Sequence, residues 1–169
     1  MARSIRFRLR ALLGAAALAA AAPSCAQVRD VEMKAAYIFN FAQFTTWPEP
    51  RARLTFKVCA DAASALWPSL QAYNGKQVNG RPWTTADLAA QPSQAIQASC
   101  DLLVLARSGA ALPAAPGMLV VRDGPGLAPA MIALDDGDEH IRFDIDTREA
   151  ARNGLRFSSK LLRLARTVL

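Results

Sequence analysis

Histidine and cysteine are scarce in this sequence, which has one histidine and three cysteines in 169 residues. Two of the cysteines, Cys59 and Cys100, lie beyond the N-terminal leader, and neither has another cysteine or a histidine close by in the chain. Because a structural zinc site takes about four such ligands, this inventory argues against a metal held by the two thiols. The residues also contain no recognisable set of catalytic groups, so they favour a protein that is not an enzyme and has no cofactor.

Long apolar runs are also missing. A membrane-spanning helix needs roughly 20 apolar residues, and the alanine-rich run 11–22 offers only about twelve. This run follows four arginines between positions 3 and 10 and ends at small residues, an arrangement typical of a secretory signal peptide. The sequence therefore predicts a signal peptide over residues 1–26, cleaved after Ala26, and one exported domain over residues 27–169 in the periplasm.

Cys25 leaves a second interpretation of the leader open, because a cysteine after small residues can become the lipid-modified first residue of a bacterial lipoprotein. The preceding residues 22–24 lack the aliphatic side chain that such sites usually carry. Cleavage after Ala26 is therefore preferred over lipidation.

The excess of positive charge is concentrated in the leader. The whole chain has 20 basic and 14 acidic side chains, and removal of the four leader arginines reduces the formal net charge from +6 to +2. A nearly neutral mature protein gives little support to nucleic acid as a partner.

Export places Cys59 and Cys100 in an oxidising compartment, where a pair of cysteines predicts a structural disulfide. Cys59 ends the strand-like run 54–59, and Cys100 precedes the apolar run 102–106. A bond between them would join two neighbouring strands of one sheet.

The apolar patterns predict an α/β fold. The run 102–106 shows no alternation, which is typical of a strand covered on both faces, and 118–121 resembles it. Segment 78–83 contains Pro82 and is predicted to be an edge strand or an extended loop. Together these elements predict a mainly parallel sheet with helices on both sides. The connecting elements are predicted as a helix over 62–73 and weak helical turns over 87–90 and 93–98, with a short crossover over 108–117.

The first predicted helix, over residues 28–44, has two apolar faces. One of them carries Tyr37, Phe41 and Phe44. Two interpretations of this aromatic face are open: it lies under other parts of its own domain, or it contacts a second copy or another protein.

Two glycine-containing loops raise ligand hypotheses. Residues 123–127 follow a strand at the edge where α/β sheets often bind ligands, although they lack the glycine spacing of a phosphate-binding loop. Segments 131–134 and 140–145 are predicted to form a hairpin with an acidic turn over 135–138. A metal bound there beside His140 is the weaker alternative to a solvated hairpin tip, because the spacing departs from that of a calcium loop.

The C-terminal segment predicts a helix over 147–153, a left-handed stop at Gly154, and a second helix over 158–168 with Ser158 or Ser159 as its cap. Ser158 and Lys160 are also spaced as a serine nucleophile and a lysine base. Helix capping explains both residues without chemistry, so a hydrolase is the least favoured hypothesis.

Three stretches resemble the YfiR-like family of bacterial periplasmic proteins: residues 34–41 followed by Trp47-Pro48, residues 141–145, and residues 150–165. The resemblance implies a three-layer α/β/α sandwich with a mixed, mainly parallel sheet. It also implies a disulfide between Cys59 and Cys100. A second cysteine pair found in some members is absent here, so redox control by that pair does not carry over.

The resemblance further implies a non-enzymatic inhibitor that binds the periplasmic sensor part of a membrane-bound diguanylate cyclase, and so controls cyclic di-GMP and biofilm formation. The Tyr37, Phe41 and Phe44 face is then expected to contact this partner or a second copy in a homodimer. A periplasmic small-ligand-binding protein that uses the loop 123–127 is the alternative function.

Overall fold

The apolar run near residue 102 forms strand β5 (Leu102–Leu105) in the middle of an eight-stranded sheet, as its unbroken hydrophobic sequence predicts. The computed structural model describes residues 24–48, 53–106, 114–126, 129–136 and 140–169. The signal-peptide prediction therefore falls largely outside the described residues.

The described elements alternate along the chain in the α/β manner. The helices are α1 (Ser24–Gln43), α2 (Trp67–Gln71), α3 (Ser93–Ser99), α4 (Thr147–Arg152) and α5 (Ser159–Leu162). Besides β5, the strands are β1 (Thr45–Thr46), β2 (Phe56–Ala60), β3 (Gln77–Val78), β4 (Arg81–Asp87), β6 (Leu119–Asp123), β7 (Ile132–Asp136), β8 (Ile141–Ile145), β9 (Arg156–Phe157) and β10 (Thr167–Val168).

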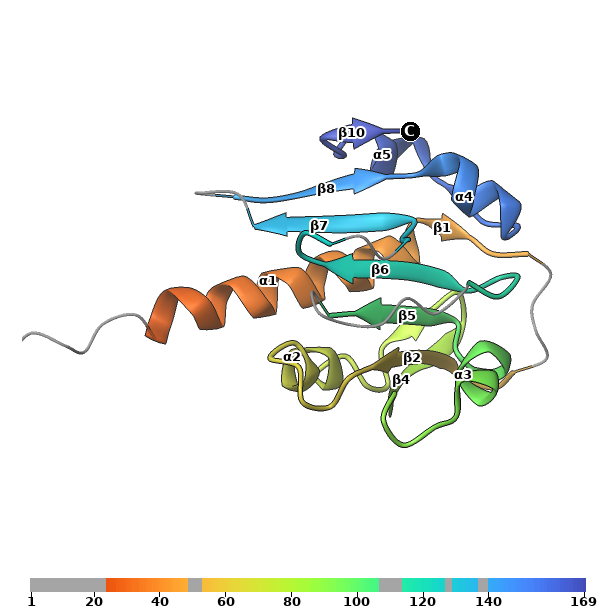
Figure 1. Ribbon diagram of the computed structural model, residues 1–169, viewed down its shortest axis with the longest axis horizontal. Coiled ribbons are helices and arrows are strands. Elements are labelled where there is room, and N and C mark those ends of the chain that lie inside the picture. The colour runs from red at the N-terminus through yellow and green to blue at the C-terminus, as the bar shows by residue number, and fades with distance from the viewer. Residues whose placement is uncertain (1–23, 49–52, 107–113, 127–128, 137–139) are drawn as a thin grey trace, which may run out of the picture.

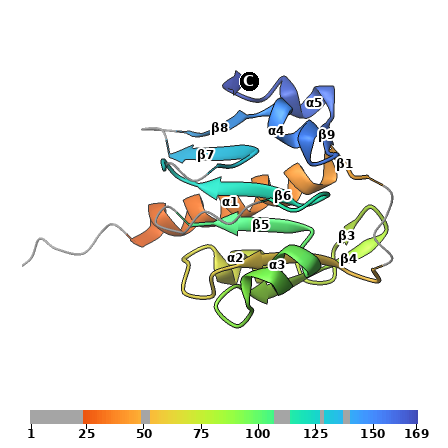
Figure 2. The same cartoon turned by 45° about the vertical axis from the view of Figure 1, so that its right-hand side comes forward.

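The main sheet is mixed and mainly parallel, with the strand order β10-β8-β7-β6-β5-β2-β4-β3 (Figure 1 labels β10 to β4, and Figure 2 labels β3). Its central strands are parallel from β4 through β2, β5 and β6 to β7, whereas β7 and β8 form the predicted antiparallel hairpin. Strands β1 and β9 form a separate antiparallel pair, which ties the end of α1 to the C-terminal segment. The predicted α/β fold class is confirmed.

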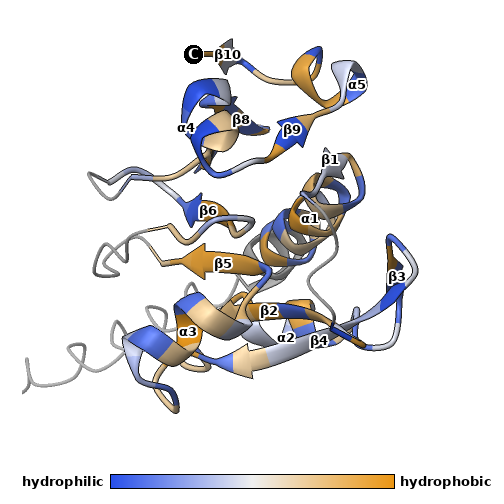
Figure 3. Ribbon diagram, turned by 90° about the vertical axis from the view of Figure 1, so that its right-hand side faces the viewer, coloured by the Kyte–Doolittle hydropathy of each residue, from blue (hydrophilic) through white to orange (hydrophobic). Residues whose placement is uncertain are grey.

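Both faces of the sheet are covered. Leu102 and Val104 of β5 belong to a hydrophobic cluster shared with α1, whereas Leu103 and Leu105 belong to a second cluster shared with α3. Figure 3 shows α1 and α3 on opposite sides of the strands, and Figure 2 shows α2 and α3 beside the lower strands of the sheet. Because alternate residues of a strand face opposite ways, one apolar run fills both cores.

The edge beyond β2 differs from the prediction. Strand β4 runs from Arg81 to Asp87 parallel to β2, and the two-residue strand β3 lies outside it, so β3 forms the edge. The helical turn predicted over 87–90 is wrong at its start, because Asp87 still pairs with Ala60. Proline is tolerated in β4 because its nitrogen points away from β3, whereas the Trp83 N–H donates to the Lys76 carbonyl directly before β3, and because the pairing with β2 begins only at Trp83.

The helix predicted over 62–73 is also shorter, since α2 covers only Trp67–Gln71. Before it the chain makes turns instead, in which the Asp61 carboxylate accepts the N–H of Ala63 and the Ser64 hydroxyl accepts that of Leu66. Such side-chain contacts offer the backbone an alternative to helical hydrogen bonds.

The last predicted helix is wrong beyond Leu162. Ser158 caps α5 by accepting the N–H of Leu161, as predicted, and Gly154 has a left-handed φ of 76°. After α5, however, Thr167–Val168 forms β10, parallel to β8. Arg166 holds it there, because its guanidinium lies 2.6 Å from a carboxylate oxygen of Asp135 and 2.5 Å from one of Asp144.

Strand β10 should loosen in acid. The hydrogen bond from Arg166 lowers the pKa of the Asp144 carboxyl, against a smaller opposite effect of partial burial. A lowered pKa stabilises the folded state above the unfolded value of about 3.9, and this contribution is lost as the pH falls through the folded pKa. We expect the Leu169 amide, which donates to the Ile145 carbonyl, to lose hydrogen-exchange protection as the pH falls below about 4 and passes through the lowered pKa of Asp144.

The matched variant is Asp144→Asn, which cannot ionise. Its Leu169 amide should show low protection that changes little over the same pH range. Equal and constant protection in both proteins would contradict a role for this ion pair.

Candidate functional site

The predicted disulfide joins Cys59 of β2 to Cys100, with a Cα–Cα distance of 5.9 Å. Cys100 directly follows α3 and precedes β5, and in the parallel ladder Cys59 lies opposite Leu103 of β5. Both cysteines are fully buried in the cluster under α3. The bond therefore connects neighbouring strands, as predicted, and is shielded from reductants in solution.

The aromatic face predicted on α1 is not one continuous surface. Phe41 is completely buried, with its ring centroid 4.8 Å from that of Phe143 of β8. Phe41 is therefore wrong as a residue for partner contact, because the helix packs this side chain against its own sheet. Phe44 is 38% exposed and lines a groove at the end of the helix.

Tyr37 instead lines a shallow hollow of about 360 Å³, together with Ile141, Arg142, Phe143, Leu164 and Arg166. We name this surface the Tyr37 hollow. Leu164 is 69% exposed, and the Tyr37 ring centroid lies 5.8 Å from that of Phe143. An exposed leucine beside a partly exposed tyrosine is a feature of protein contact surfaces.

At the carboxyl edge of the sheet, Lys34 of α1 binds two carboxylates. Its amino group lies 2.7 Å from oxygens of both Asp123 and Asp136, which end β6 and β7. Burial alone lowers the pKa of Lys34, but the two carboxylates outweigh it and the pKa is raised. Asp123, which opens the loop of the small-ligand hypothesis, is thus already bound to α1, and Leu127 at the end of that loop lies outside the described residues.

The acidic turn proposed for a metal is only partly described, because Gly137 and Asp138 fall outside the described residues. Of its other carboxylates, Asp135 binds Arg166 and Asp136 binds Lys34. In the part of the chain that the structure describes, no group of three or more acidic, histidine or cysteine side chains could hold a metal ion.

The Ser158 hydroxyl is a helix cap in the structure, because its oxygen accepts the Leu161 amide at 3.3 Å. Lys160 is exposed on α5. The capping interpretation of Ser158 is confirmed, while the hydrolase hypothesis gains no support from this contact.

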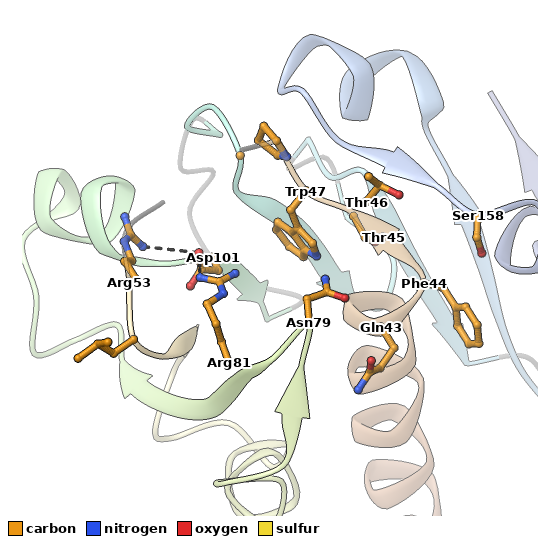
Figure 4. A pocket seen from close by; sticks show the side chains of 13 residues that line it. Gln43, Phe44, Thr45, Thr46, Trp47, Arg53, Asn79, Arg81, Asp101 and Ser158 are labelled. Atoms are coloured by element: carbon orange, nitrogen blue, oxygen red, sulfur yellow. Dashed lines mark hydrogen bonds and ion pairs between the residues drawn. The ribbon is translucent and has the colours of Figure 1, made fainter. Parts of the chain in front are cut away.

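A groove of about 850 Å³ lies at the amino ends of the parallel strands, opposite to the edge suggested by the sequence. We name it the amino-edge groove. Figure 4 shows Arg53, Asp101 and Arg81 together on one wall, with Trp47 and Asn79 beside them. It is lined by Gln43, Phe44, Thr45, Thr46, Trp47, Pro48, Arg53, Leu54, Asn79, Arg81, Asp101, Gly117 and Ser158.

Asp101 organises this wall. Its side chain is only 2% exposed, and one carboxylate oxygen lies 3.2 Å from Arg81 and 3.7 Å from Arg53. The other oxygen accepts the backbone N–H of Lys57 at 2.9 Å. A buried carboxylate is costly unless it is paired in this way, so Asp101 fixes both guanidinium groups at the groove.

A family model described as YfiR/HmsC-like matches residues 31–166, which is most of the chain. The chain belongs to the YfiR/HmsC-like family. The matched range includes α1 from Val31 onward, the disulfide, the Tyr37 hollow and the amino-edge groove. Members of the YfiR/HmsC-like family are periplasmic regulators and are not enzymes.

A solved structure supports the fold of this YfiR/HmsC-like chain. A conserved domain protein from Vibrio cholerae O1 biovar El Tor superposes with a TM-score of 0.52 at 12% sequence identity. The match covers 82% of this chain and 60% of the Vibrio protein, so the chain spans about three fifths of that protein's length. At this identity the likeness shows the fold alone. No curated protein matches the chain significantly.

No helix within the described part of this YfiR/HmsC-like chain is long and apolar enough to span a membrane.

The arginines of the amino-edge groove were not found from the sequence. The only local signal was Asp101, a charged residue that directly precedes a buried strand.

Proposed function

We propose that the protein is a periplasmic negative regulator that binds the periplasmic sensor part of a membrane-bound diguanylate cyclase and restrains its activity. The observation that carries this proposal is the YfiR/HmsC-like match over residues 31–166. A regulator that inhibits the cyclase by binding to its sensor part needs a rigid scaffold and an exposed contact surface. It does not need to catalyse a reaction.

The scaffold requirement is met by the buried disulfide and by a core that continues on both faces of the sheet. A rigid partner loses little conformational freedom on binding, which favours tight association.

We propose the Tyr37 hollow as the contact surface. Tyr37 belongs to this surface, as it did to the predicted aromatic face, whereas Phe41 does not. Leu164 is the large apolar residue of the surface instead. Leu164 is a large apolar side chain that is mostly exposed, and Arg142 beside it is also exposed. Apolar centres with arginine at the margin are common where proteins meet, and a few such residues often dominate the affinity.

The proposal is tested by binding of the exported protein to the isolated periplasmic part of a diguanylate cyclase, ideally one encoded beside its gene. Leu164→Asp should weaken binding about tenfold or more, because it places a charge at the centre of the contact. Leu169→Asp is the matched control, since Leu169 is 60% exposed and does not line the hollow. It should bind as the unchanged protein does.

Both variants should keep their stability, because substitutions at exposed positions usually change it little. If Leu164→Asp binds as well as the control, the Tyr37 hollow is not the contact surface. If the unchanged protein binds no diguanylate cyclase, the regulatory proposal fails. The mass of the purified protein in solution tests the homodimer separately.

A small-ligand-binding protein remains the second candidate function. The amino-edge groove favours it, because the groove combines charged, amide and aromatic side chains in one concave surface. The loop 123–127 of the original hypothesis is a poorer location, since Lys34 already pairs with Asp123.

A further inference from the structure

We propose that the amino-edge groove binds a carboxylate group, and that Arg81 is the residue that recognises it. The inference rests on the charges and hydrogen-bond donors of the groove wall and is independent of the proposed cyclase partner. It also lies on a different surface from the Tyr37 hollow.

The described part of the groove wall carries two guanidinium groups and one carboxylate. Arg53 and Arg81 contribute two positive charges, and both are paired with the single carboxylate of Asp101. The remaining described residues that line the groove are uncharged. Among these described residues the guanidinium groups outnumber the carboxylates, which favours an anionic ligand.

The two arginines differ in how their donors are used. Arg53 donates to the carbonyl oxygens of Ala98 and Ser99 at the end of α3, so its guanidinium is committed to the protein. Arg81 uses one terminal nitrogen, Nη1, which contacts Asp101 and, at 3.4 Å, the carbonyl of Thr55. Its Nε and Nη2 donate to no acceptor among the described residues.

These unused donors can be reached by a ligand. The Arg81 side chain is 15% exposed, and among the described residues Nε and Nη2 do not belong to the fully buried side-chain atoms that have no hydrogen-bond partner. Its guanidinium also lies over the Phe56 ring at 5.1 Å, which fixes the plane of the group. An arginine whose guanidinium is fixed in orientation and has unused N–H donors can form hydrogen bonds to a ligand.

The geometry points to a carboxylate. Nε–H and one Nη2–H of arginine are parallel and match the two oxygens of a carboxylate in a bidentate pair. Figure 4 shows the end of Arg81 at the groove, near Asp101 and with Asn79 and Trp47 on its other side. Trp47, Phe44 and Leu54 also line the groove and offer apolar contact for the body of the ligand.

The test is a titration of ¹⁵N-labelled protein observed at the arginine Nε–H resonances. Butyrate should shift the Arg81 Nε–H signal with a Kd of about 1 mM, and butyramide, which has the same shape without the charge, should not. Arg81→Lys should weaken butyrate binding about tenfold or more, because lysine keeps the charge and loses the bidentate fork. Arg152→Lys on the exposed side of α4 is the control and should bind butyrate unchanged.

Two further ligands distinguish the source of the carboxylate. The first is an acetylated dipeptide with a free C-terminus, and the second is the same dipeptide with an amidated C-terminus. If the first binds more tightly than butyrate and the second does not bind, the natural ligand is the C-terminus of a peptide. Weaker binding of that dipeptide identifies a small free acid, and both results support the site.

The proposal is overturned if the Arg81 signal is unmoved by butyrate, or if inorganic phosphate binds there more tightly than butyrate does. Should Arg81→Lys fail to fold, the Arg81 signal of the unchanged protein still decides between butyrate and butyramide.

Discussion

Replacement of both Cys59 and Cys100 by alanine should lower the free energy of unfolding by about 4 kcal/mol. The bond closes a loop between residues 41 positions apart, and the entropy of that loop in the unfolded chain gives this magnitude. Since folded domains are stable by only about 5–15 kcal/mol, the loss should bring the protein close to its unfolding limit. Urea unfolding without reductant, followed by circular dichroism, measures the effect.

The unchanged protein provides the control for this experiment. Because both sulfur atoms are fully buried, a reductant should act slowly in native buffer and quickly in urea. A loss below about 1 kcal/mol in the double variant would contradict a structural role for the bond. Free thiols in protein purified without reductant would show that the bond does not form.

Phe41→Ala should lower the free energy of unfolding by about 3–5 kcal/mol, because it removes a buried ring and leaves a cavity between α1 and β8. Phe41 contacts both Phe143 and Tyr37 through its ring. The matched control is Phe44→Ala, three residues further along, where a 38% exposed ring should contribute about 1 kcal/mol or less.

This pair of variants separates the two interpretations of the aromatic face. If Phe41 belongs to the core, its replacement destabilises the isolated protein, and any loss of partner binding follows from unfolding. Similar small losses for Phe41→Ala and Phe44→Ala would contradict the observed burial of Phe41.

The elements that were predicted correctly are those whose signal is local. The unbroken apolar run at β5 predicted a strand that is buried on both faces of the sheet. The alternation of apolar residues in β2 and β8 predicted which side of each strand faces the core. Gly154 and Ser158 were found because a left-handed stop and a helix cap depend on the residue type at one position.

The features that were missed depend on residues far apart in the chain. Arg81 and Asp101 are 20 positions apart, and Arg166 and Asp135 are 31 positions apart, so no local pattern reveals either ion pair. The first pair builds the amino-edge groove. The second holds β10 on the sheet, where helical periodicity alone predicted a longer helix.

The burial of Phe41 was missed for a related reason. Periodicity shows which residues share a face of α1, but only the packed structure shows what covers that face. Phe143 covers Phe41, while the end of the helix leaves Phe44 partly exposed. One stripe of aromatic residues therefore divides into core and surface.

The central claim is that the protein restrains a diguanylate cyclase from the periplasm. It is tested most directly by measuring cellular cyclic di-GMP after deletion of the gene, with complementation by the unchanged protein or by Leu164→Asp. The account predicts that deletion raises cyclic di-GMP, that the unchanged protein restores the low level, and that Leu164→Asp does not. A level that is the same with and without the gene, in cells that contain the cyclase, would contradict it.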